Sequence, residues 1–104
     1  MKKPTILVAE DDSSIRKLIY NLLKDNYEVL LTADGLEAKE CYERHAERIE
    51  AVITDVQMPG LNGAQLAEWL RQRGRPVTII LMSGDTGEIE VEHLLRQERV
   101  TRLH

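Results

Sequence analysis

Short apolar runs alternate along the chain with longer stretches in which apolar residues recur at helical spacing. Buried strands are predicted at residues 5–9, 27–33, 51–55 and 77–82, with a short last strand at 100–104. Helices are predicted around the repeats at residues 15–23, 38–45, 66–70 and 88–98. This alternation predicts an α/β protein with a parallel sheet and helices on both faces, because each right-handed crossover lays its helix against the sheet.

Capping and turn residues mark the ends of these helices. Asp12 and Ser13 are alternative N-caps for the first helix, and residues 34–37 have the spacing of a capping box at the start of the second. Gly74 is suited to the C-terminal end of the third helix, and Pro76 prevents its continuation. The helix boundaries are therefore predicted from individual cap and turn residues as well as from the spacing of apolar residues.

The second helix has an apolar face on which Ala38, Cys41, Tyr42 and His45 are brought together. We expect Cys41 to lie in the core, where a reactive role is disfavoured. For Trp69, on the third helix, the pattern leaves both a packed and an exposed position open.

Acidic and hydroxyl side chains follow the predicted strands where these strands end. Glu10, Asp11 and Asp12 come after the first strand, Asp55 ends the third, and Ser83 follows the fourth. The carboxyl ends of parallel strands meet at one edge of the sheet, where ligands bind in open α/β folds. Carboxylates brought together there raise one another's pKa values, and a hard cation such as Mg²⁺ relieves their repulsion.

These acidic residues also have purely structural explanations. An Asp that ends a strand often serves as a helix cap or turn residue, which is the alternative for Asp55. Negative charge at residues 10–12 favours the start of the first helix, and for Asp12 this explanation is preferred. The chemical alternative is that Asp55, beside Mg²⁺, attacks a phosphoryl donor and forms an aspartyl phosphate, while the hydroxyl of Ser83 holds a phosphoryl oxygen. A lysine for the remaining charge is missing from this edge.

Size and composition set the class of protein. The chain has 104 residues, of which 42% are hydrophobic and 31% charged, as in an ordinary single globular domain. A net charge of -4 argues against general nucleic-acid binding, which needs a basic face. No apolar run approaches the roughly 20 residues of a membrane span, so no membrane partner is expected. The single Cys41 cannot form an internal disulfide, which agrees with a cytoplasmic location.

Together, the motifs resemble the receiver domain (CheY-like) of response regulators in two-component signal transduction systems. The segments that carry the resemblance are Val-Ala-Glu-Asp-Asp at 8–12 with Ile15 and Arg16, Asp34-Gly35 with Glu37 and Ala38, Thr-Asp-Val-Gln-Met-Pro-Gly at 54–60 with Asn62 and Gly63, and Met-Ser-Gly-Asp at 82–85. The resemblance covers nearly the whole chain. It implies a flavodoxin-like, doubly wound, five-stranded parallel sheet of order 2-1-3-4-5.

The resemblance also implies a role for each matching residue. Asp55 would be the phosphoacceptor and a Mg²⁺ ligand, and Asp11 the other direct ligand. Glu10 would act through bound water, and the backbone carbonyl of Gln57 would complete the protein's share of the coordination. Ser83 would be the hydroxyl that switches toward the phosphoryl group.

Two further features follow from the resemblance. Gln57 and Asp85 occupy positions that influence the lifetime of the phosphoryl group. The expected Lys-Pro pair would follow His104 directly, so we expect residues 1–104 to be a single receiver domain truncated just before that pair and the final helix. Arg102 stands about where the family has an aromatic switch residue, which puts the usual output relay in question.

The function implied is that of a signalling phosphoacceptor rather than a classical enzyme. It would take its phosphoryl group from a histidine kinase or histidine phosphotransfer domain and act on an output partner or linked domain that the sequence does not identify. One alternative is an interaction module with the receiver fold that phosphate does not switch. A haloacid-dehalogenase-like phosphatase is disfavoured, because Gln57 stands where such enzymes need a second acid.

Overall fold

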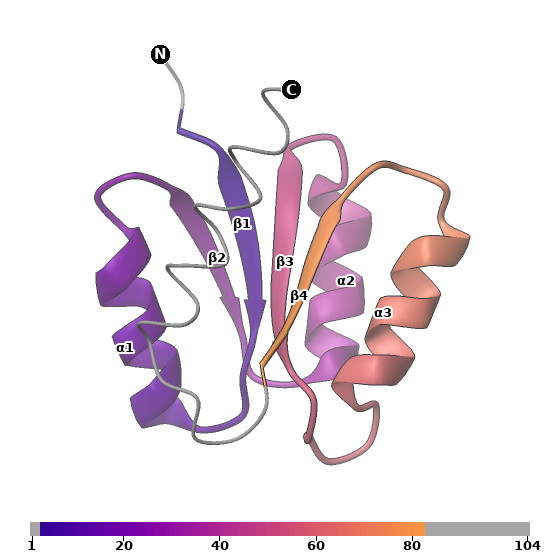
Figure 1. Cartoon of the computed structure of the whole chain (residues 1–104), viewed down its shortest axis with the longest axis horizontal. Helices are drawn as coiled ribbons and strands as arrows, with labels where there is room; N and C mark the ends of the chain where they lie inside the picture. Colours follow the sequence, from indigo (N-terminus) through magenta and orange to yellow (C-terminus); the bar gives the residue numbers. More distant parts are fainter. Residues whose placement is uncertain (1–2, 83–104) are drawn as a thin grey trace.

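The computed structural model describes residues 3–82, which form a parallel sheet with helices on both sides (Figure 1). The elements are, in chain order, β1 (Thr5–Ala9), α1 (Ser13–Leu23), β2 (Glu28–Thr32), α2 (Gly35–His45), β3 (Ile49–Asp55), α3 (Gly63–Gln72) and β4 (Thr78–Met82). The strand predicted at 100–104 and the helix predicted at 88–98 lie outside the described residues. Within residues 3–82 no helix has the length and apolar character needed to cross a membrane.

The sheet order is β2-β1-β3-β4, and all three neighbouring pairs are parallel. This confirms the first four places of the flavodoxin-like order, in which the chain leaves β1 in one direction and crosses back to β3 on its other side. The two central strands, β1 and β3, are buried along most of their length because helices cover both faces of the sheet. β1, for example, is buried at every residue.

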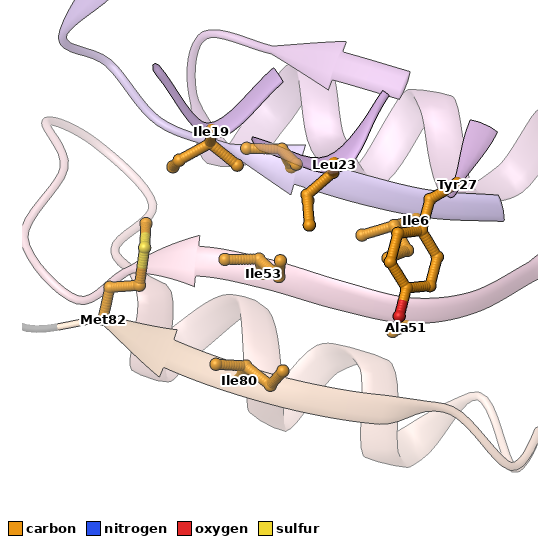
Figure 2. Packing of buried hydrophobic residues seen from close by; sticks show 9 residues of the cluster. Ile6, Ile19, Leu23, Tyr27, Ala51, Ile53, Ile80 and Met82 are labelled. Atoms are coloured by element: carbon orange, nitrogen blue, oxygen red, sulfur yellow. The ribbon is translucent and has the colours of Figure 1, made fainter. Parts of the chain in front are cut away.

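Two apolar clusters hold the helices to the sheet. Figure 2 shows Ile19 and Leu23 of α1 directed at Ile6 of β1 and Ile53 of β3 on one face. The opposite face packs against α2 and α3, and its buried members include Leu7, Val52, Tyr42, Leu66 and Leu70. The two central strands are therefore fixed from both sides, and their carboxyl ends are held rigidly relative to each other.

The strand boundaries differ slightly from the predicted ones. β3 begins at Ile49 rather than at residue 51. The apolar pattern did not predict its first two residues because exposed Glu50, between buried Ile49 and Ala51, interrupts the apolar run. β2 is shorter than predicted by one residue at each end.

The second helix is less apolar on its inner side than predicted. Ala38 and Tyr42 are buried, but Cys41 and His45 are only half-buried, so the predicted core position of Cys41 is wrong in degree. Cys41 packs at the edge of the cluster, where burial raises the pKa of its thiol. Trp69 is half-buried and meets Tyr42 edge to face at 5.8 Å between ring centroids.

The helix starts are capped by side chains. Asp12, rather than Ser13, caps α1. At α2 the Asp34 carboxylate accepts from the Glu37 N–H, while the Glu37 carboxylate accepts from the residue before Asp34, so the predicted capping box is only half formed. A complete, unpredicted capping box begins α3, where Asn62 and Gln65 exchange hydrogen bonds of 2.9 Å.

Candidate metal centre

The register of the central strands brings the predicted acidic residues together. β1 and β3 pair in parallel with Ala9 opposite Thr54, so Glu10 and Asp55 come next on adjacent strands. Glu10, Asp11 and Asp55 each offer a carboxylate oxygen, and these oxygens lie within 4.8 Å of one another. The expectation that these three side chains converge is confirmed. Below they are called the acidic triad.

Glu10 is the buried member of the acidic triad, with 2% of its surface exposed. Burial, together with the nearby carboxylates of Asp55 and Asp11, raises its pKa to about 7 despite the lowering effect of a hydrogen bond from the Asp12 N–H. Because its pKa is raised toward neutrality, Glu10 retains its proton more readily than an ordinary glutamate when no cation is bound. A divalent cation would displace this proton and replace the repulsion by attraction.

Asp55 serves the turn as well as the acidic triad. It ends β3, and its Oδ1 accepts a 3.1 Å hydrogen bond from the Gln57 N–H. Asp55 is therefore a turn residue, as the structural alternative predicted, and also a member of the acidic triad. The Val56 N–H donates to the Met82 carbonyl at 2.9 Å, which ties the start of this loop to β4.

The amino end of α3 packs directly on the backbone of Asp55. The Gly63 N–H donates to the Val56 carbonyl at 3.0 Å. A β-carbon at Gly63 would collide with the Asp55 carbonyl oxygen and would lie 2.9 Å from both the Asp55 carbonyl carbon and the Val56 Cα. Only glycine allows this approach, so Gly63 helps to fix where the Asp55 side chain stands.

The loop between β1 and α1 is fixed by hydrogen bonds around Glu10. The Glu10 N–H donates to the Thr32 carbonyl at 3.1 Å, and Arg16 Nη1 donates to the Glu10 carbonyl at 2.8 Å. Glu10 Oε2 accepts from the Asp12 N–H at 2.9 Å. The supporting roles of Thr32 and Arg16 were not predicted. Asp12 stays out of the acidic triad and caps α1, as the sequence favoured.

An open hollow of about 490 Å³ lies along the loop that follows Asp55. Its lining residues are Val56, Gln57, Met58, Pro59 and Asn62. Gln57 therefore lies in this loop beside the acidic triad, while the ligand role of its carbonyl stays a prediction. Ser83 and Asp85 lie outside the described residues, and their roles also stay predictions.

The donor set suits a hard divalent cation. All three side chains of the acidic triad offer carboxylate oxygens, the ligands that Mg²⁺ and Ca²⁺ bind in proteins, and neither sulfur nor imidazole belongs to the group. Asp11 is exposed and Asp55 half-buried, so one side of the group is open to water and to a second ligand. Mg²⁺ usually keeps several waters and combines few carboxylates with phosphate oxygens, which matches this arrangement.

Comparison with known proteins identifies the family. The model of the response regulator receiver domain matches residues 6–103. The chain is 35% identical over 91 residues to the transcriptional regulatory protein AruR of Pseudomonas aeruginosa, covering 84% of this chain and 37% of AruR. It is 39% identical over 85 residues to the 3',5'-cyclic-nucleotide phosphodiesterase regA of Dictyostelium discoideum, covering 79% of this chain and 11% of regA. The chain thus spans well under half the length of these curated relatives.

A solved structure agrees with these sequence matches. The receiver domain of the hybrid histidine kinase CckA superposes with a TM-score of 0.76 at 30% identity, and the match covers 89% of this chain and 96% of that one. The chain belongs to the response regulator receiver domain family.

Proposed function

We propose that this chain is a phosphoacceptor that carries a phosphoryl group on Asp55 with Mg²⁺ bound. Receiver domains of response regulators are signalling proteins rather than classical enzymes. The observation that carries the proposal is the acidic triad at the carboxyl ends of two adjacent parallel strands. A merely structural sheet edge has no need of three carboxylates within 4.8 Å, because their repulsion destabilises the fold.

Asp55 is the nucleophile in this proposal. One of its carboxylate oxygens attacks phosphorus, the P–N bond to the donor histidine breaks, and the histidine nitrogen leaves with the bonding electron pair. The hydrogen bond from the Gln57 N–H and the close contact with Gly63 hold the carboxylate in place before the donor arrives. The chain thereby catalyses its own phosphorylation, and attack by water on phosphorus later breaks the bond to the Asp55 oxygen, releases inorganic phosphate and restores the carboxylate.

Asp11 and Glu10 complete the cation site. Asp11 and Asp55 are the direct carboxylate ligands, Glu10 acts through water, and the backbone carbonyl of Gln57 supplies a further oxygen. When bound, Mg²⁺ neutralises charge that develops on the phosphoryl oxygens. Ser83 supplies the hydroxyl for a phosphoryl oxygen, and Gln57 and Asp85 set the lifetime of the acyl phosphate.

The partners in this proposal are a histidine kinase or histidine phosphotransfer domain as donor and an output partner or linked domain as reader. We also propose that residues 1–104 belong to a single receiver domain, as expected from the sequence. The named relatives include a transcriptional regulator and a phosphodiesterase, both far longer than this chain, so their output activities are not transferred to it.

Intact mass measurement tests the proposal. The chain is incubated with acetyl phosphate and Mg²⁺, and we expect a single phosphoryl adduct in the wild type and none in Asp55→Asn. Asp12→Asn is the matched control, because it removes one acid from the neighbouring loop while asparagine still caps α1. The control is expected to be phosphorylated like the wild type.

Two results would count against the proposal. An adduct that survives Asp55→Asn would place the reaction elsewhere. A wild type that neither binds Mg²⁺ nor gains a phosphoryl group would instead favour the interaction module that phosphate does not switch.

A further inference from the structure

Arg16 lies beside the acidic triad but forms no ion pair with it. Its Nη1 donates to the main-chain carbonyl of Glu10 at 2.8 Å. The ion pairs Arg48–Glu28 and Arg73–Glu43 lie elsewhere in the described part of the chain. A guanidinium that binds the neutral Glu10 carbonyl leaves the carboxylate oxygens of the acidic triad available for a cation.

The carbonyl that accepts from Arg16 belongs to Glu10, the first residue of the loop between β1 and α1. Glu10 is buried, its N–H is already fixed by the Thr32 carbonyl, and its Oε2 accepts from the Asp12 N–H. The hydrogen bond from Arg16 fixes the Glu10 carbonyl, which belongs to the peptide that joins Glu10 to Asp11. Rotation of that peptide would swing the Asp11 carboxylate away from Asp55.

We propose that Arg16 is a positioning residue for the cation site, which acts by holding the Glu10 carbonyl so that the Glu10 and Asp11 carboxylates face Asp55. This inference rests on the proposed function and adds to it a residue that touches neither the cation nor the phosphoryl group. Arg16 comes six residues after Glu10 on α1. α1 therefore anchors the loop through this side chain as well as through its Asp12 cap.

Positioning and simple electrostatics predict opposite effects of removing Arg16. A positive charge near a cation site repels the cation, so its loss alone would tighten Mg²⁺ binding. If Arg16 positions the loop, its loss releases the Glu10 peptide and weakens binding. Loss of a supporting hydrogen bond behind metal ligands typically weakens binding about 10-fold or more.

The experiment measures the Mg²⁺ dissociation constant of the full chain by isothermal titration calorimetry. Arg16→Met keeps the aliphatic stem and helix propensity but removes every donor, and we expect its dissociation constant to rise about tenfold. Arg16→Lys keeps the charge and offers a donor without the planar fork, so it should fall between Met and the wild type, at about threefold. The rate of phosphorylation by acetyl phosphate at subsaturating Mg²⁺ should follow the same order.

Two controls separate positioning from other effects. Lys17→Ala removes an exposed charge from the next position of α1 and should bind Mg²⁺ as tightly as the wild type or more tightly. Ile19→Val loosens the packing of α1 without touching the loop and should leave the dissociation constant unchanged.

Each outcome decides the inference. An Arg16→Met protein that binds Mg²⁺ as tightly as the wild type, or more tightly, overturns it. If Arg16→Met does not fold, Arg16→Lys decides: a threefold weaker site supports positioning, and an unchanged one overturns it. A wild type that binds no Mg²⁺ refutes the proposed function instead, so the two failures are distinguishable.

Discussion

The buried carboxyl of Glu10 should make the cation-free protein less stable as the pH rises. Its pKa is raised from 4.5 to about 7, mainly by burial and then by the charges of Asp55 and Asp11. Between these pH values the folded state binds more protons than the unfolded state, so the free energy of unfolding falls as pH increases. At about 1.36 kcal/mol for each pH unit that separates the two pKa values, the loss is about 3 kcal/mol.

Glu10→Gln removes this titration while keeping the shape and the acceptor for the Asp12 N–H. We expect the variant to match the wild type in stability near pH 4.5 and to exceed it by up to about 3 kcal/mol at pH 8, both in EDTA. Urea unfolding across this pH range measures the difference. Addition of Mg²⁺ at pH 8 should raise the free energy of unfolding of the wild type more than that of Glu10→Gln, because a cation that binds only the folded state stabilises it.

The matched control is Glu40→Gln, which changes an exposed glutamate on α2. Its stability relative to the wild type should stay constant across the pH range. A difference between Glu10→Gln and the wild type that is equally flat from pH 5 to 8 would refute the reasoning, because Glu10 would then ionise at an ordinary pKa.

Other substitutions test the packing around the site and the core. Gly63→Ala should lower the free energy of unfolding, measured in urea, by about 1–3 kcal/mol and should slow phosphorylation, since the new β-carbon meets the Asp55 backbone. Gly74→Ala is the control: its backbone is strained at a φ of 78° but its surroundings are open, so it should lower stability without slowing phosphorylation. Tyr42→Phe should raise the free energy of unfolding by about 1 kcal/mol, because the Tyr42 hydroxyl is buried and has no hydrogen-bond partner among the residues described; a loss of stability would reveal a partner for it. The calorimetric Mg²⁺ affinity should rise as Glu10 loses its proton up to about pH 7 and then level off, whereas a constant affinity from pH 5 to 8 would show that no proton is displaced.

The apolar runs predicted the central strands well because both faces of a parallel strand are buried, so the signal is continuous. The same rule fails at Glu50, where one exposed side chain interrupts the apolar run, so the first two residues of β3 were not predicted. Convergence of Glu10 and Asp55 was also predictable, because strand order and parallel direction place the ends of β1 and β3 side by side.

The residues that support the site were not predictable in this way. Arg16 and Thr32 act on main-chain groups of Glu10, and such contacts depend on the path of the chain in three dimensions rather than on a motif. Capping at Asn62 was hidden in a glycine-rich bend. The fit between Gly63 and the Asp55 carbonyl is a matter of tenths of an ångström, which no spacing rule conveys.

The position of Trp69 determines what its fluorescence can report. It is the single tryptophan of the chain, and its ring contacts Tyr42 of α2 and lies near the charged groups of Lys39 and Arg73. Six residues along α3 separate it from Gly63, which at about 1.5 Å per residue places it some 9 Å along the helix axis from the end that contacts Asp55. Emission should therefore follow the docking of α2 on α3 during unfolding and stay nearly constant when a cation binds, which makes it a clean optical signal for the stability measurements above.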